Sequence, residues 1–155
     1  MATMYEGKKH LKSAWVAKAK ENVVIKPWGK EKTWTGFSGV HGKILFVDKG
    51  KKTSLKFHKV KSEVLFLKVG KAQVVFGNEC SFEDPVGNPM QTDILLPGDT
   101  LLVQSGCPYR IIALEDSEII EIGNYMSDQP IRVLDDYDRE SKEIETYKEV
   151  VSEYS

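Results

Sequence analysis

The segment Ser54–His58 carries two side chains whose types and spacing could do chemistry. Its polar and apolar residues alternate, which predicts a half-buried β-strand with Lys56 and His58 on the same face. The imidazole, with an unperturbed pKa of ~6.5, is suited to proton abstraction near neutral pH. The ammonium of Lys56 has three donors and no lone pair, so it cannot ligate a metal cation and would repel one.

Tyr109 and Arg110 form a second pair of interest. A tyrosine hydroxyl can donate a proton to a ligand oxygen, and an arginine can contact a phosphate. Successive residues of a strand face opposite sides, however, so these two side chains line one cavity only if a bulge intervenes.

Short strands must position these residues, because apolar segments recur at intervals of about ten residues between Val23 and Val133, with turn residues between them. No helical pattern separates them, which favours a sandwich or barrel over a parallel α/β sheet. Strand order alone leaves lipocalin-like, jelly-roll and OB-like barrels open. Residues 79–92 hold two prolines and read as a loop. The expected strands are Ile44–Val47, Ser54–His58, Val64–Leu67, Ala72–Phe76, Ile94–Leu96, Leu101–Val103, Arg110–Ile112 and Glu118–Ile122.

The two ends of the chain differ from this middle. Residues 3–20 could form a short helix, although the periodicity there is weak. The C-terminal segment is clearer, with apolar residues at helical spacing that should lie on the barrel or on a partner subunit. We therefore expect an N-terminal extension over 1–22, a barrel over 23–139 and an amphipathic helix over 140–155. The stripe of that helix consists of Ile144, Tyr147, Val150, Val151 and Tyr154.

Composition excludes several classes of protein. A chain of 155 residues fits one domain, and a formal net charge of -1 gives no basic surplus of the kind that nucleic-acid binders show. Cys80 and Cys107 are too few for a disulfide framework, so a reducing compartment is expected. No apolar run approaches the roughly 20 residues that span a membrane. These features predict a cytoplasmic protein that binds neither nucleic acid nor membrane.

Four motifs, in the expected order, resemble those of cupins. The first two are residues 50–63 followed by Gly70, and Pro97-Gly98-Asp99 followed by the segment 106–110. Residues 26–29 and 133–139 resemble the Pro-Trp-Gly and Asp-Asp-Tyr-Gly-Arg motifs of phosphomannose-isomerase-like cupins, with Asp138 at the usual glycine. These relatives include the C-terminal domains of mannose-1-phosphate guanylyltransferases. The resemblance implies an all-β cupin fold, a double-stranded β-helix (jelly-roll) barrel with a C-terminal helix.

The resemblance also implies a metal site that is partly lost. Cupins of this kind typically hold a divalent metal with histidines and a glutamate. In phosphomannose isomerases a glutamine is a further ligand. His58 and Glu63 match two ligand positions, whereas Lys56 stands at the glutamine position, Tyr109 at the second histidine position and Val60 at a third. We expect no tightly bound metal; Zn, Mn, Fe or Ni would bind weakly, through His58 and Glu63. An inward Lys56 would instead pair with Glu63 and supply the positive charge.

By resemblance, the chain handles a sugar or sugar phosphate. Metal-free cupin epimerases and ketoisomerases of nucleotide-sugar pathways use a histidine base, an orienting carboxylate and a tyrosine acid, and His58, Glu63 and Tyr109 match these roles. The alternative is a non-catalytic module that kept the barrel, binding a small ligand or serving in an assembly. A homodimer is expected in either case. The expected ligand-binding residues are Lys56, Cys107 and Arg110.

Overall fold

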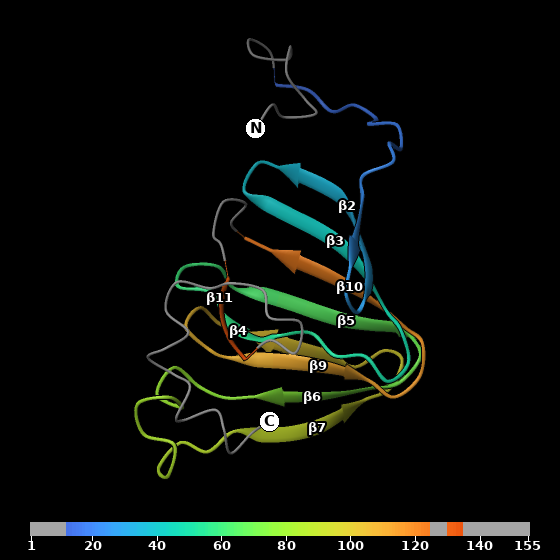
Figure 1. Ribbon diagram of the computed structural model, residues 1–155. Coiled ribbons are helices and arrows are strands. Elements are labelled where there is room, and N and C mark those ends of the chain that lie inside the picture. The colour runs from blue at the N-terminus through green and yellow to red at the C-terminus, as the bar shows by residue number, and fades with distance from the viewer. Residues whose placement is uncertain (1–11, 125–129, 135–155) are drawn as a thin grey trace.

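The structure, a computed structural model, describes residues 12–124 and 130–134, which form two antiparallel sheets (Figure 1). The six-stranded sheet has the order β1-β2-β3-β10-β5-β8, and the five-stranded sheet the order β11-β4-β9-β6-β7. The strands are β1 (Val23–Lys26), β2 (Gly29–Phe37), β3 (Val40–Val47), β4 (Leu55–Phe57), β5 (Glu63–Val69), β6 (Ala72–Phe76), β7 (Gln91–Leu95), β8 (Thr100–Val103), β9 (Tyr109–Ala113), β10 (Ser117–Gly123) and β11 (Ile131–Leu134).

All eight expected strands are present. The expected loop ends at Met90, because β7 begins at Gln91, earlier than the predicted start at Ile94. The structure adds β1, β2 and β11. Residues 26–29, which resemble a cupin motif, form the turn of the β1–β2 hairpin, in which Lys26 pairs with Gly29.

The helix expected over residues 3–20 is wrong for its described part, because residues 12–20 have no regular structure. Only the weak periodicity favoured a helix there, and the segment contacts β2 without one, through an edge-to-face pair between the Trp15 and Phe37 rings, whose centroids lie 5.2 Å apart. The expected C-terminal helix lies outside the described residues. The two described ranges contain no helix, and so none with the length and hydropathy of a membrane span.

The barrel is apolar at one end and polar at the other. On β3, β10 and β5 the side chains that point inward are polar at one end of each strand and apolar at the other. The register of the three strands places polar residues beside polar ones and apolar residues beside apolar ones. Ile119 lies between Leu45 and Leu67 in the apolar layer, whereas Gly123 lies between His41 and Glu63 in the polar layer. Aliphatic side chains of both sheets fill the apolar end as one core. The polar end is left to form a site.

We predict that Ile119→Ala costs about 2–5 kcal/mol of unfolding free energy, because Ile119 is fully buried and its removal leaves a cavity in a packed core. Its neighbour Ile120 is half-buried on the outer face, so Ile120→Ala should cost about 1 kcal/mol or less. Urea unfolding of both variants measures the difference. Equal losses would contradict the inward register of β10.

Candidate functional site

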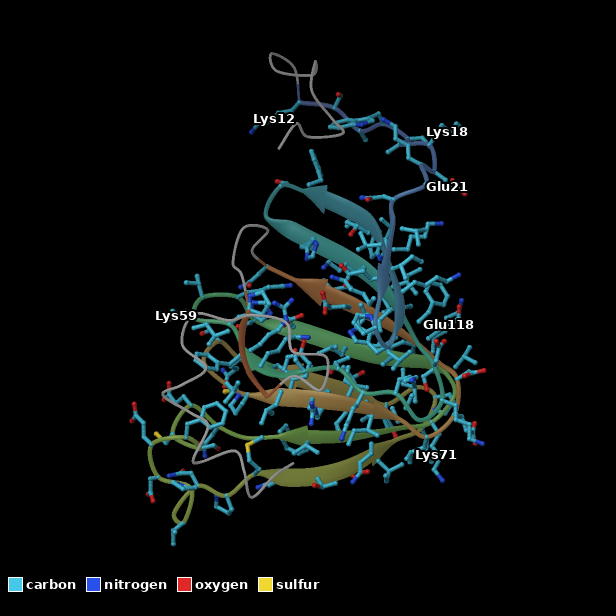
Figure 2. The ribbon with its side chains drawn as sticks, in the orientation of Figure 1. Lys12, Lys18, Glu21, Lys59, Lys71 and Glu118 are labelled. Atoms are coloured by element: carbon cyan, nitrogen blue, oxygen red, sulfur yellow. The ribbon has the colours of Figure 1, made fainter. Side chains whose placement is uncertain are left out.

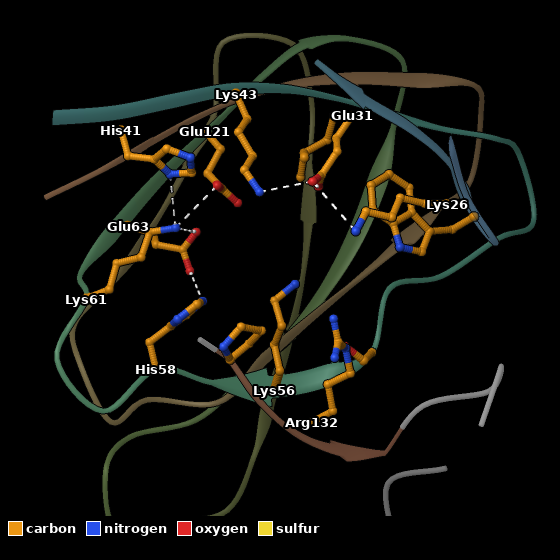
Figure 3. Close-up of a pocket in the computed structure, with 14 residues that line it drawn as sticks. Lys26, Glu31, His41, Lys43, Lys56, His58, Lys61, Glu63, Glu121 and Arg132 are labelled. Atoms are coloured by element: carbon orange, nitrogen blue, oxygen red, sulfur yellow. Dashed lines mark hydrogen bonds and ion pairs between the residues drawn. The ribbon is translucent and has the colours of Figure 1, made fainter. Parts of the chain in front are cut away.

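A cavity of about 260 Å³ opens at the polar end of the barrel (Figure 3). Its charged side chains lie in two groups in that view. The carboxylate cluster consists of His41, His58, Lys61, Glu63 and Glu121, and the cationic cluster consists of Lys26, Glu31, Lys43, Lys56 and Arg132.

Glu63, the first residue of β5, is bonded to side chains on both of its carboxylate oxygens. His58 Nε2 lies 3.0 Å from its Oε1, and the Tyr109 hydroxyl donates to the same oxygen at 3.1 Å. Lys61 Nζ lies 3.4 Å from Oε2. Burial alone would raise the pKa of Glu63, but the bonds from His58 and from Glu121 and the charges of nearby lysines outweigh it and hold that pKa well below its usual value. Glu63 is therefore a fixed anion.

Glu121 on β10 behaves in the opposite way. It is 5% exposed, and burial together with the charge of Glu63 raises its pKa to about 7. Two carboxyl groups this close do not ionise independently, so the second retains its proton far above the usual range. The pair shares its environment with Lys61, whose Nζ lies 3.5 Å from Glu121 Oε2.

Lys61 lies at the centre of the cluster. It is 6% exposed, although Lys59, two residues earlier, is exposed on the outside of the barrel (Figure 2). The side chain of Lys61 reaches His41 Nδ1 at 3.4 Å as well as the two carboxyl groups. Burial, Lys61 and Lys43 lower the pKa of His41 to about 4, so this imidazole is neutral at neutral pH.

The cationic cluster carries an excess of positive charge. Glu31 receives ion pairs from Lys43 at 3.1 Å and Lys26 at 3.6 Å. Lys56 and Arg132 also line the cavity. Among the described residues, three lysines of this cluster therefore face its one carboxylate. Burial lowers the pKa of Lys56, while the charges of Glu63 and Glu121 oppose that shift, and its Nζ lies 5.1 Å above the centre of the Tyr109 ring. A pocket with this charge suits an anionic ligand.

Three of the residues expected from the sequence come together on the cavity wall, namely Lys56, His58 and Glu63. The expected pairing of Lys56 with Glu63 is wrong in one respect. Among the described residues, the ion pairs to Glu63 come from His58 and Lys61, and Lys56 acts on it only through its charge. Lys61 approaches Glu63 from the β4–β5 connection, whereas Lys56 stands farther along the cavity (Figure 3).

Tyr109, Arg110 and Cys107 do not line this cavity. Tyr109 is buried beneath it, and burial and Glu63 raise the pKa of its hydroxyl, which holds Glu63 rather than facing a ligand. Arg110 faces the other way, as alternation requires, and its Nε donates to the Thr53 carbonyl at 2.7 Å. Cys107 packs against the core, and burial raises the pKa of its thiol. Arg110 and Cys107 therefore lie outside this cavity, and their ligand-binding roles stay predictions.

Sequence reasoning missed several residues of the site. Neither His41 nor Lys61 was singled out from the sequence, yet both line the cavity, and Lys61 is buried there. Alternation along β3 and β10 was a usable signal, because His41 and Lys43 share a face with Leu45, and Glu121 shares one with Ile119. Lys61 lies outside any strand, so alternation gave no signal for it.

No protein-family model matches the chain, and no curated protein matches it either. Solved structures do. A cupin 2 domain-containing protein from Halorhodospira halophila matches with a TM-score of 0.53 at 20% identity, over 66% of this chain and 67% of that one. The chain has the cupin fold. This agrees with the fold expected from the motifs, while the phosphomannose-isomerase-like subtype is not shown.

Two larger cupin-fold proteins match with similar scores. Bacillus subtilis oxalate decarboxylase, described with Mn(II) centres, has a TM-score of 0.58 at 20% identity, over 68% of this chain. The Staphylococcus aureus capsular polysaccharide assembling protein CapF has a TM-score of 0.57 at 14% identity, over 70% of this chain. This chain spans only 28% and 30% of those two proteins. At such identities the likeness establishes the fold alone.

The donors of this cupin pocket do not fit a divalent metal. Among the described residues, no three of the histidine, cysteine, aspartate and glutamate side chains are arranged to hold one. The chemistry explains why, because an ammonium lies between His41, Glu63 and Glu121 at 3.4–3.5 Å. Metal ligation needs distances near 2.0–2.2 Å and lone pairs aimed at the ion, and here those lone pairs face a cation already.

We predict that the unfolding free energy of the wild-type protein falls, relative to Glu121→Gln, as the pH rises from about 4.5 to 7. The pKa of Glu121 is raised in the folded state, so the folded protein binds more protons than the unfolded one in that window, and this stabilisation is lost as the pH rises. The change should be on the order of 1–3 kcal/mol. Urea unfolding at pH 5 and pH 8 measures it, and the histidines cancel because both proteins carry them. Parallel pH profiles would contradict the prediction.

Proposed function

We propose that this chain is a sugar-handling cupin that takes a small anionic sugar derivative, such as a sugar phosphate or a sugar acid, into the barrel. The observation that carries this proposal is the cationic cluster, in which, among the described residues, the three lysines Lys26, Lys43 and Lys56 face the carboxylate of Glu31. Buried or half-buried cations in such excess are costly unless an anion joins them. A phosphate or carboxylate group supplies that anion.

Three further points support a sugar-type ligand. The motifs at residues 26–29 and 133–139 resemble those of phosphomannose-isomerase-like cupins. One fold neighbour, CapF, is described as a capsular polysaccharide assembling protein. The cavity is polar on most of its wall, which suits a ligand rich in hydroxyl groups.

The proposed chemistry is proton transfer beside the carbonyl of the bound sugar, as in an isomerase or epimerase. His58 is the base, because it lines the cavity and its Nε2 is hydrogen-bonded to the ionised Glu63. The carboxylate orients the ring and favours the imidazolium that forms when the base takes a proton. Tyr109 is a positioning residue for Glu63.

A second candidate is a non-catalytic binding module. The observation that favours it is the position of Tyr109, whose hydroxyl lies beneath Glu63 and does not line the cavity. The histidine base then lacks the tyrosine acid that the resemblance implies. Binding without turnover is the expected behaviour of such a module.

Isothermal titration calorimetry with mannose 6-phosphate, glucuronate and neutral mannose tests the ligand class. We predict that both anions bind more tightly than mannose, and that Lys56→Met weakens anion binding about 10-fold or more, because a charged hydrogen bond is lost. Lys51→Met is the matched control, since Lys51 is exposed and outside the cavity. Equal affinity for neutral and anionic sugars, or equal loss in both variants, would overturn the proposal.

Exchange of a sugar carbon-bound proton with D₂O, followed by NMR, separates the two candidates. An isomerase or epimerase exchanges the proton next to the carbonyl, and His58→Ala abolishes the exchange while the protein stays folded. Binding of the same sugar with no exchange in the wild-type protein would support the binding module instead.

A further inference from the structure

The ammonium of Lys61 occupies a cage of three acceptors. Its Nζ lies 3.4 Å from His41 Nδ1, 3.4 Å from Glu63 Oε2 and 3.5 Å from Glu121 Oε2. The acceptors come from three neighbouring strands of one sheet, β3, β5 and β10, and Figure 3 shows them converging on the lysine. An ammonium has three donors, and these three acceptors are ones that it can bond.

Gly123 makes room for this side chain. It lies on β10 directly between His41 on β3 and Glu63 on β5. A Cβ at this position would collide with Cε of Lys61. The aliphatic stem therefore occupies the space that any other residue at position 123 would fill, and this places the ammonium among the acceptors.

Two of these acceptors are in the state that an ammonium requires. Glu63 is ionised, and His41 is neutral at neutral pH, so its ring carries a lone pair. One imidazole nitrogen and two carboxyl groups are also the donors that a divalent metal uses. His58, bonded to the other oxygen of Glu63, stands beside them.

We propose that the Lys61 ammonium is the resident cation of this cupin pocket, and that it takes the place among His41, Glu63 and Glu121 that a divalent metal would occupy. The inference goes beyond the proposed function, because it concerns the pocket itself and holds whichever ligand enters. It also assigns to Lys61 the role that was expected of Lys56, which is to supply the positive charge in place of a metal.

The test removes the ammonium and asks whether a metal replaces it. Wild-type protein, Lys61→Ala and the control Lys56→Ala are stripped with EDTA, titrated with Zn²⁺ and Mn²⁺, dialysed and analysed for metal. We expect no uptake by the wild type or by Lys56→Ala. Lys61→Ala should take up about one ion per chain. Without metal, this variant should unfold at a lower temperature than the wild type, and added metal should raise its unfolding temperature again.

Two results would overturn the proposal. One is stoichiometric metal in the wild-type protein that Glu63→Gln removes. The other is a folded Lys61→Ala that takes up no more metal than Lys56→Ala. If Lys61→Ala does not fold, ¹H–¹⁵N spectra of lysine ammonium groups in the wild type decide the point. An ammonium protected from solvent exchange, and absent from Lys61→Arg, supports the cage, and the absence of any protected ammonium refutes it.

Discussion

Two carboxyl groups buried side by side impose the strongest constraint on this structure. Glu63 and Glu121 lie at the polar end of a small barrel, where ionised groups without partners cost several kcal/mol each. Lys61 touches both, and one of the two retains its proton. Together these features leave a cluster whose charges nearly cancel, which lets the barrel tolerate an acidic interior.

The same constraint explains how the barrel is divided. A strand whose inward residues were all polar would have no core, and one whose inward residues were all apolar would have no site. On β3 and β10 the inward residues change from polar to aliphatic within a few positions, so one end packs and the other stays open. The apolar end supplies the stability that offsets the cost of the charged end.

The fold was largely predictable, because eight strands follow from local apolar patterns and the motifs indicate a cupin barrel among the possible barrels. The site was predictable only where its members lie close in sequence. Lys56 and His58 share one strand face, and Glu63 follows at motif spacing, whereas His41 and Glu121 meet Lys61 only after β3, β5 and β10 pair in a particular register. Register depends on contacts across many residues, which a local pattern does not encode. Gly123 shows the same limit, since its role depends on a lysine sixty-two positions earlier in the chain.

The two clusters together make the charge uneven along the cavity, nearly neutral at one side and positive at the other. The carboxylate cluster is compensated internally by Lys61, whereas in the described part of the cationic cluster three lysines exceed the one carboxylate. Lys56 and His58 are two residues apart on one face, a separation of about 7 Å along the strand. An anionic group drawn to Lys56 therefore leaves the neutral part of the same small molecule beside His58. The arrangement orients a ligand by its charge and presents its uncharged carbons to the base, without a metal ion to hold it.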